Sequence, residues 1–321
     1  MFNRNAKKKM RFSDFLSGEY VRDYISQNIP YAEQIDRAAR LIRKADYVLI
    51  GAGAGMSTAA GAEYGGKFFE EHFAEFQQVY GKGPYMQDMY SAGFYPFPDQ
   101  ESKWGLWSHL ALLAGADLDV TPLHKTLLDA LEGKKLFLLS TNADHQFEKA
   151  GLPVERIFQT QGSYRLIQCR RGCHNKTYDA VEQFRQMEQA RQNGKIPGEL
   201  VPKCPVCGGD MAMNLRVDNF FVEDENWHAA EERFSRFLSE CVDGKTVLLE
   251  LGVGFNTPMI IRFPFEKLTR EHENVSLVRL SRSKAMVPAS LGDRAVGINA
   301  DMAQSITDIA AKLKETGADE P

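Results

Sequence analysis

The chain has 321 residues, of which 43% are hydrophobic, so it is long enough for a substantial core and about two domains of roughly 150 residues each. Its 39 basic and 43 acidic residues give a net charge of -4, which gives no indication of a nucleic-acid or anionic-membrane partner. Because no stretch approaches the roughly 18–20 apolar residues of a membrane span and no secretory h-region follows the basic start, we expect a globular cytoplasmic protein without membrane contact.

The predicted elements alternate between strands and helices. Residues 1–30 are expected to form an N-terminal extension, with the basic stretch MFNRNAKKKMRF at 1–12 as a solvated tail. A helical pattern at 31–44 is followed by an apolar burst at 47–50 that runs into the glycine loop GAGAG. Further strand-like bursts lie at 135–141, 245–252 and 275–281, with helical stretches at 121–132 and 226–242. This βαβ order predicts an α/β fold, a Rossmann-like parallel sheet with helices on both faces.

Two segments interrupt this order. Residues 62–115 are rich in aromatic side chains and contain no clear strand, so they predict a helical insertion that covers the edge of the sheet. Residues 166–214 form a second insertion, whose middle has helical periodicity and ends at a glycine. The Rossmann-like domain would then comprise 31–165 and 215–321, with a small zinc-binding domain between them.

Four of the five cysteines lie in the second insertion as two short pairs. Cys169 and Cys173 form C-x3-C, and Cys204 and Cys207 form C-x2-C. Four thiolates in such pairs suit the tetrahedral geometry of zinc, and an all-cysteine site leaves no open position for a substrate, so the zinc would be structural. The alternative of two disulfides conflicts with the lack of a signal peptide. His174 could replace a thiolate, but four cysteines make this unnecessary.

Glycine loops follow two of the predicted strands. The first, GAGAGMSTAAG at 51–61, suits a phosphate cradled on backbone N–H groups. On its own it is a weak signal, because Met56 replaces the third glycine of G-x-G-x-x-G and the expected ribose-binding acid is ambiguous between Glu70 and Glu71. A turn without a ligand remains an alternative. The second loop, LGVGFNTP at 251–258, also ends a strand, and two loops that converge on one crevice favour a dinucleotide.

GAGAGMS, TNADHQF, the strand into QGS, the four-cysteine segment and LGVGFN follow one another along the chain. With these motifs in this order, the chain resembles the sirtuins, the Sir2 family, from about residue 31 to 310. The Cys-x3-Cys-His pair, MNLRVD and ELGVGFNTP look like the macrodomain-linked class M sirtuins of microbial pathogens. That subgroup is known for protein ADP-ribosyl transfer, typically onto a lipoylated carrier protein. The resemblance implies NAD as co-substrate, structural zinc and a protein substrate.

Three departures from the usual sirtuin pattern bear on the reaction. The sirtuin histidine falls on Gln161, the F-G-E turn is replaced within NFFVEDENW, and the Pro-Asp-Phe-Arg element reads EYGGKFF. Deacylation needs a general base, which histidine supplies near neutral pH and glutamine cannot. Direct capture of the ribosyl carbon by an acceptor needs no such relay. We therefore expect an NAD-dependent protein ADP-ribosyltransferase; a protein-lysine deacylase and an NAD-binding sensor without turnover remain alternatives.

The predicted catalytic residues are Asn142, Asp144, Gln161 and Arg216. An amide and a carboxylate after a strand can bind ribose hydroxyls or orient the acceptor, although both also cap turns. Arg216 suits a phosphate or an acidic acceptor, with a surface ion pair as the alternative. His145 is the nearest substitute base, but it is expected to point away from Asp144 and to serve packing or the surface.

The resemblance also implies a set of cofactor-binding residues at the glycine loops and strand ends. Besides Asn142, Asp144 and Gln161, these are Gly51, Ala52, Gly53, Ala54, Gly55, Ser57, Thr141, Gly252, Val253, Gly254, Asn256, Ser281, Arg282, Ala300 and Asp301.

Overall fold

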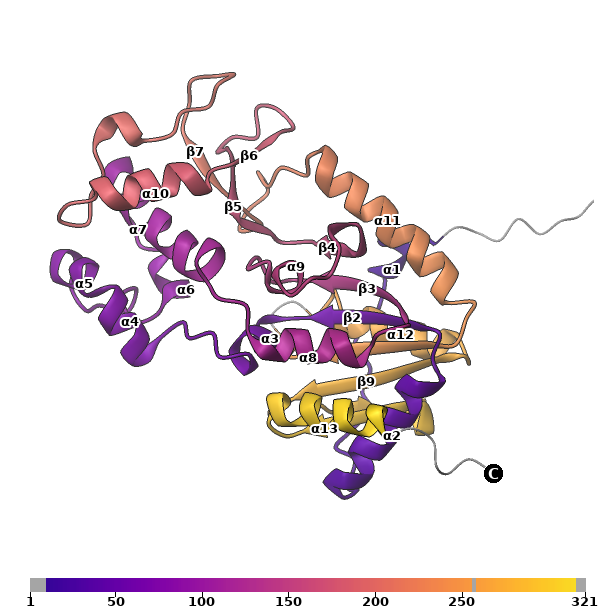
Figure 1. The fold of residues 1–321 in the computed structure, drawn as a ribbon. Coiled ribbons are helices and arrows are strands. Elements are labelled where there is room, and N and C mark those ends of the chain that lie inside the picture. Colours follow the sequence, from indigo (N-terminus) through magenta and orange to yellow (C-terminus); the bar gives the residue numbers. More distant parts are fainter. Residues whose placement is uncertain (1–9, 256–257, 316–321) are drawn as a thin grey trace, which may run out of the picture.

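A computed structural model describes residues 10–255 and 258–315 of the chain (Figure 1). Its centre is a six-stranded sheet in the order β11-β9-β8-β2-β3-β4, with every neighbouring pair parallel. The strands are β2 (Tyr47–Ala52), β3 (Lys135–Ser140), β4 (Ile157–Gln159), β8 (Thr246–Leu251), β9 (Val275–Ser281) and β11 (Ala295–Asn299). The predicted parallel sheet is confirmed.

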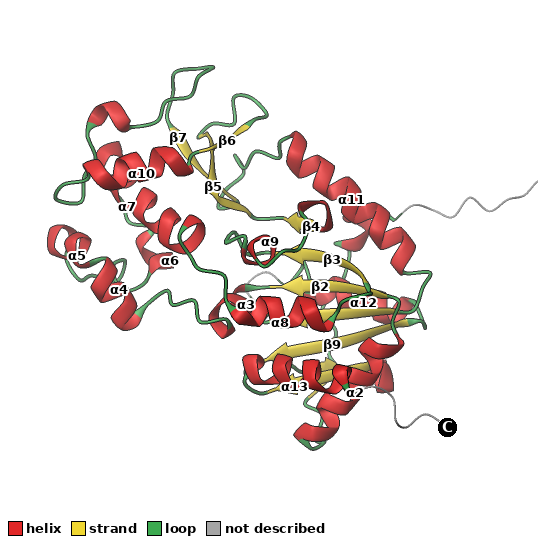
Figure 2. Ribbon diagram, viewed as in Figure 1, coloured by secondary structure: helices red, strands yellow, loops and turns green. Residues whose placement is uncertain are grey.

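Helices cover both faces of this sheet, as Figure 2 shows. One face packs against α2 (Tyr31–Lys44), α8 (Pro122–Ala130), α9 (Gln146–Lys149) and α13 (Met302–Lys314). The other packs against α1 (Phe12–Phe15), α11 (Glu225–Cys241) and α12 (Arg262–Glu271). Alternation along β2 produces the two cores, because Val48 and Ile50 belong to the first and Leu49 to the second. The buried strands therefore read as continuous apolar runs.

The N-terminal segment belongs to the core. The ring of Phe12 lies 5.0 Å from that of Phe158 in the edge strand β4 and 5.7 Å from that of Phe234 in α11. Further along, β1 (Tyr24–Ile25) pairs antiparallel with β10 (Val287–Pro288), next to the 3-10 helix η4 (Ala289–Arg294). The prediction of a solvated tail over 1–12 is wrong at Phe12. It rested on the basic composition of the stretch, whereas the Phe12 ring packs against buried partners. Residues 1–9 lie outside the described part.

The second insertion forms a three-stranded sheet in the order β6-β5-β7. Its elements are β5 (Gly162–Cys169), β6 (Thr177–Asp179), α10 (Val181–Ala190), η3 (Gly198–Leu200) and β7 (Met211–Leu215). Both strand pairs are antiparallel. A 3-10 turn, η2 (Val154–Arg156), precedes β4 in the larger sheet. The division of the chain into 31–165 with 215–321 and a zinc-binding insertion at 166–214 stays a prediction.

The aromatic segment at 62–115 is helical, as predicted, but its position differs. It contains α4 (Gly66–His72), α5 (Ala74–Tyr80), α6 (Met89–Ala92), α7 (Gln100–Ala111) and the start of the π-helix η1 (Leu112–Ala116). Trp104 and Leu112 share a core with Phe184 of α10 and Ile167 of β5. The segment therefore packs on the small sheet, on the left of Figure 1, whereas α11 lies along the edge strand β4. The predicted covering of the sheet edge is wrong.

A buried ion network crosses one face of the main sheet. Glu250 of β8 pairs with Arg262 of α12 at 2.9 Å and with Arg279 of β9 at 2.7 Å. Arg279 also pairs with Glu266 at 2.7 Å, and Tyr24 donates to Glu266 at 2.7 Å. The four charged residues are 0% exposed. Two arginines and two glutamates balance one another, which allows these charges to be buried.

In the described part of the chain, no helix combines the length and the apolar composition that a membrane crossing requires.

Candidate active site

The two glycine loops meet at the carboxyl ends of β2 and β8. The chain leaves β2 for β3 on one side and later returns to β8 on the other, so these strands form the switch point of the sheet, where open α/β sheets bind ligands. Gly53 donates to the carbonyl of Leu251, and Gly55 donates to that of Gly252, both at 3.0 Å. A Cβ on Gly55 would lie 2.7 Å from the Gly252 Cα. The predicted convergence of the two loops is confirmed.

A hydrogen-bonded chain of side chains joins the first glycine loop to the loop after β3. The amide Nδ2 of Asn142 donates to the carbonyl of Gly53 and to Ser57 Oγ, both at 3.0 Å. Ser57, in α3 (Ala54–Ala59), donates in turn to Asp144 Oδ2 at 2.5 Å. Asp144 is only 5% exposed, and its other oxygen accepts from the Gln146 amide at 3.1 Å. The structure thus brings three predicted residues together: Asn142, Ser57 and Asp144.

Two tyrosines near Asp144 were not found from the sequence. Burial and the charge of Asp144 raise the pKa of Tyr164 to about 12. The same two causes raise the pKa of Tyr64, although a hydrogen bond with Ser57 opposes the shift. Burial lowers the pKa of His124, which also lies within the electrostatic influence of Asp144. Two neutral tyrosines therefore lie near Asp144, and Lys149 also lies within the electrostatic influence of this carboxylate. Tyr64 lies in the EYGGKFF departure and Tyr164 follows QGS, and these positions were the available signals.

Gln161 connects the large sheet to the small one. Its side-chain Nε2 donates to Thr160 Oγ1 at 3.2 Å, and its carbonyl accepts from the amide of Arg216 at 3.1 Å. Gly162 follows with φ 92°, and a Cβ there would lie 1.9 Å from the carbonyl oxygen of Asn214, so only glycine fits. Among the described residues, no hydrogen bond joins the Gln161 side chain to Asn142 or Asp144. Its catalytic role stays a prediction.

Arg216 is already partnered. Its Nη2 forms an ion pair of 2.5 Å with Glu223, with both side chains 35% exposed. The guanidinium lies 4.1 Å from the Phe221 ring centroid, and its Nε donates to the carbonyl of Thr160 at 3.3 Å. The ion pair, which was the alternative interpretation, is present in the structure. To bind a phosphate or an acidic acceptor, the Arg216 guanidinium would have to break its ion pair with Glu223 or bind both groups at once.

The other predicted cofactor residues lie at strand ends. Thr141 Oγ1 donates to the carbonyl of Ala52 at 3.3 Å. Arg262, from the buried ion network, donates to the carbonyl of Val253 at 3.1 Å. Asp301 caps α13 by accepting from the Gln304 amide at 2.9 Å. Gly51 and Ala52 are the last two residues of β2, and Ala54 opens α3. Gly254 follows Val253, Ser281 ends β9 with Arg282 directly after it, and Ala300 follows β11. Asn256 lies outside the described residues.

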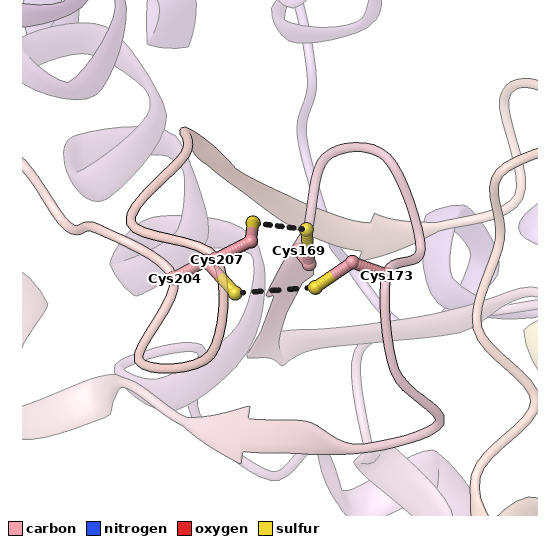
Figure 3. Close-up of side chains that lie close together, drawn as sticks. All are labelled: Cys169, Cys173, Cys204 and Cys207. Atoms are coloured by element: carbon pink, nitrogen blue, oxygen red, sulfur yellow. Dashed lines mark hydrogen bonds between the residues drawn. The ribbon is translucent and has the colours of Figure 1, made fainter.

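The four cysteines of the second insertion converge, as Figure 3 shows. Their sulfurs all lie within 4.8 Å of one another; Cys169 and Cys207 are 3.8 Å apart, and Cys173 and Cys204 are 3.5 Å apart. Zinc–sulfur bonds of about 2.3 Å in a tetrahedron separate sulfurs by about 3.8 Å, so the four thiols fit zinc.

Thiolate character also fits metal binding at this cluster. Although burial opposes ionisation, backbone N–H groups of Cys173 and Arg171 lower the pKa of Cys169 to about 6. His174 Nδ1 lies 3.1 Å from the Cys173 sulfur, while its Nε2 lies 2.9 Å from the hydroxyl of Tyr178. The pKa of Cys204 is lowered as well, whereas burial and the neighbouring sulfurs raise that of Cys173. The described residues thus offer four sulfur ligands, with His174 beside them.

Comparison with known proteins identifies the family. No protein-family model matches the chain. Solved structures share its fold at 14% identity: a Sir2 homolog–NAD complex (TM-score 0.52, covering 93% of this chain and 97% of that one) and a Sir2 mutant complex with 2'-O-acetyl ADP ribose (TM-score 0.53, 87% and 96%). A protein ADP-ribosyltransferase of Staphylococcus aureus (strain Mu50 / ATCC 700699) is 34% identical over 267 residues, which cover 83% of this chain and 84% of that protein. The chain belongs to the sirtuin-type protein ADP-ribosyltransferases.

A second relative of this sirtuin-type family is a larger protein. It is named a probable bifunctional ADP-ribose hydrolase/ADP-ribosyltransferase, from Fusarium oxysporum f. sp. cubense, and is 31% identical over 307 residues. The match covers 90% of this chain but 49% of that protein, so the chain spans about half its length. The sirtuin resemblance read from the sequence is confirmed.

Proposed function

We propose that the chain is an NAD-dependent protein ADP-ribosyltransferase. It breaks the bond between nicotinamide and ribose, and an acceptor protein captures the ribosyl carbon. The observation that supports this function most directly is a series of hydrogen-bonded side chains, Asn142–Ser57–Asp144. It lies where the two glycine loops meet. Family membership supports the same conclusion.

The residues of this crevice have distinct tasks in the proposed reaction. The glycine loops expose backbone next to the strand ends, where the dinucleotide phosphates would lie close to the main chain. The Asn142 amide and the Asp144 carboxylate would bind the reacting ribose and face positive charge that develops at its carbon. Ser57 holds the carboxylate in place with its 2.5 Å hydrogen bond.

Gln161 favours transfer over deacylation. An amide can donate and accept hydrogen bonds, but it cannot remove a proton from a ribose hydroxyl. Direct capture by the acceptor does not need that step, whereas deacylation loses about 10²–10⁴-fold without its general base. Deacylase activity and NAD binding without turnover are the competing functions.

The finer identity of the acceptor is also a proposal. The class M resemblance favours a lipoylated carrier protein, and the five free cysteines suit the reducing cytoplasm. Zinc, held by Cys169, Cys173, Cys204 and Cys207, would stabilise the small domain and would not meet the substrate.

Intact-mass analysis of candidate acceptors tests the function. The purified protein is incubated with NAD and a carrier domain in lipoylated and unlipoylated forms, with released nicotinamide measured in parallel. We expect a single ADP-ribosyl addition to the lipoylated form and an equal amount of nicotinamide. NAD binding without nicotinamide release would establish the sensor function, and release that requires an acyl-lysine peptide would establish the deacylase.

A further inference from the structure

His145 joins two side chains on the far side of the loop that carries Asp144. Its Nε2 lies 2.6 Å from Ser163 Oγ, and its Nδ1 lies 2.8 Å from Glu148 Oε2. His145 is one of two described non-glycine residues with a positive φ, at 58°. Such a conformation costs energy and persists only where the surroundings hold it, often at functional sites. Here it turns the ring between Ser163 at the start of β5 and Glu148 in α9.

The partners determine how the protons are arranged. The hydrogen bond from His145, together with its charge, lowers the pKa of Glu148 despite partial burial, so this carboxylate is an acceptor only. In the tautomer that donates from Nδ1 to this carboxylate, Nε2 is left to accept the hydroxyl proton of Ser163. Ser163 Oγ also accepts from the Arg165 amide at 2.9 Å. This is the order nucleophile, base and orienting carboxylate that activates a serine.

A cavity gives this serine room for a ligand. About 340 Å³ of space at the edge strand β4 is lined by Ser163 and His145 and by apolar parts of Leu166, Ile157 and Ala230. This volume is within the range of small-molecule sites, about 300–1,000 Å³. Nearly all of Ser163 is buried, at 3% exposed, so a ligand would reach it through this cavity.

The charges of the lining restrict the kind of ligand. Glu148, Glu155 and Asp224 outnumber Arg233 around the cavity, so a negatively charged ligand would be repelled. Trp227 adds apolar surface to the same lining. The lining thus suits a small neutral ligand.

We propose that Ser163 is the nucleophile of a second catalytic site, which hydrolyses small neutral esters. Ser163 Oγ attacks the ester carbonyl carbon while its proton passes to His145 Nε2. The alcohol leaves with that proton, and an acyl group remains on Ser163. Water then attacks the acyl carbon, gives a proton to His145, and releases the acid as the proton returns to Ser163. Glu148 is a positioning residue, because it fixes the imidazole without touching the ester.

This site is separate from the glycine-loop crevice. Asp144 has its hydrogen bonds with Ser57 and the Gln146 amide, whereas His145 contacts Ser163 and Glu148. The glycine loops do not line the cavity. Ester hydrolysis therefore requires no NAD and stands or falls independently of ADP-ribosyl transfer.

Labelling with diisopropyl fluorophosphate, a neutral probe of activated serines, tests the proposal. The full chain is treated without NAD, and the adduct is located by intact mass and peptide mapping. We expect one adduct, on Ser163, in the folded protein and none after unfolding in denaturant. His145→Ala should slow labelling at least about 100-fold, the usual scale for loss of a base, and Glu148→Gln should slow it at least about tenfold.

Ser163→Ala should lose the adduct, whereas Ser108→Ala, which alters another fully buried serine, should keep it. Hydrolysis of p-nitrophenyl acetate should follow the same order across the variants. Peptide mapping of the wild-type protein decides the question even if a variant does not fold. No adduct, or an adduct on another residue, would overturn the proposal.

Discussion

Ser57 and Asp144 are 87 positions apart in the sequence, and the serine hydroxyl donates a 2.5 Å hydrogen bond to the carboxylate. This bond fixes the helix that follows the first glycine loop against the loop that follows β3. Because both residues are nearly fully buried, at 1% and 5% exposed, their geometry is set by the packing of the sheet. The position of the carboxylate is therefore established before any substrate binds.

Replacing Asn142 should separate turnover from folding. Asn142→Ala removes the amide that binds Gly53 and Ser57, and ADP-ribosyl transfer should fall at least about 10²-fold, as when a preorganised donor is lost. The melting temperature should change little, since the side chain is only partly buried. Initial rates of nicotinamide release measure the effect. Asn219→Ala, an exposed amide elsewhere, is the matched control, and equal rates for the two variants would place the reaction at another site.

Gln161→His should introduce a proton acceptor at the junction of β4 and β5. We expect the wild-type protein to show little acyl-lysine hydrolysis and the variant to show more, because imidazole titrates near neutral pH. Transfer of ADP-ribose should fall, since the amide is lost. Both activities are measured on both proteins with the same NAD supply. Robust deacylation by the wild type would contradict this role of Gln161; no gain in the variant would show that the altered NFFVEDENW stretch also excludes acyl-lysine.

Cys204→Ser should destabilise the small domain. The loss of one of four thiolate ligands weakens zinc binding, which contributes folding free energy directly. Metal analysis should show zinc below one equivalent, and the melting temperature should fall. Cys241→Ser provides a contrast, because that buried thiol lies outside the cluster and its loss should leave zinc content unchanged. Chelation that abolished turnover while leaving the melting temperature unchanged would show that the metal is not structural.

Glu250→Gln should be strongly destabilising. It removes the carboxylate shared by Arg262 and Arg279 and leaves buried positive charge uncompensated, for which about 3–5 kcal/mol is typical. Arg165→Ala, which breaks the half-exposed pair with Asp179, should cost under about 1 kcal/mol. Urea unfolding of both variants measures the difference. Similar midpoints for the two would mean that the network contributes no more than a surface pair.

The parts of the fold that the sequence predicted are those with a local signal. The apolar run YVLI and the glycines after it are enough to place β2 and the first loop. The spacing of the four cysteines in two short pairs is enough to predict their cluster. Convergence of the two glycine loops followed from the rule that parallel strands present their carboxyl ends at one edge. Each inference needed only neighbouring residues and a general rule of topology.

The features that the sequence did not predict depend on contacts between residues that lie far apart along the chain. Glu250 interrupts an apolar strand and looks like a surface residue until Arg262 and Arg279 are placed beside it. Tyr64 and Tyr164 gain meaning only from the carboxylate of Asp144. No periodicity reports such pairings, so sequence reasoning identified Asn142 and Asp144 as polar groups without showing that Ser57 links them.

The burial of Phe12 and Phe15 has a consequence for the order in which the molecule is completed. Both rings pack against Phe234, and Phe15 also packs against Phe265, so the earliest part of the described chain is held by helices that come much later in the sequence. During synthesis, these aromatic rings emerge long before their partners exist. Contacts of such high sequence separation form slowly, because a large loop must close first. The N-terminal segment therefore completes its packing only after α11 and α12 have left the ribosome, and until then its aromatic rings lack these partners.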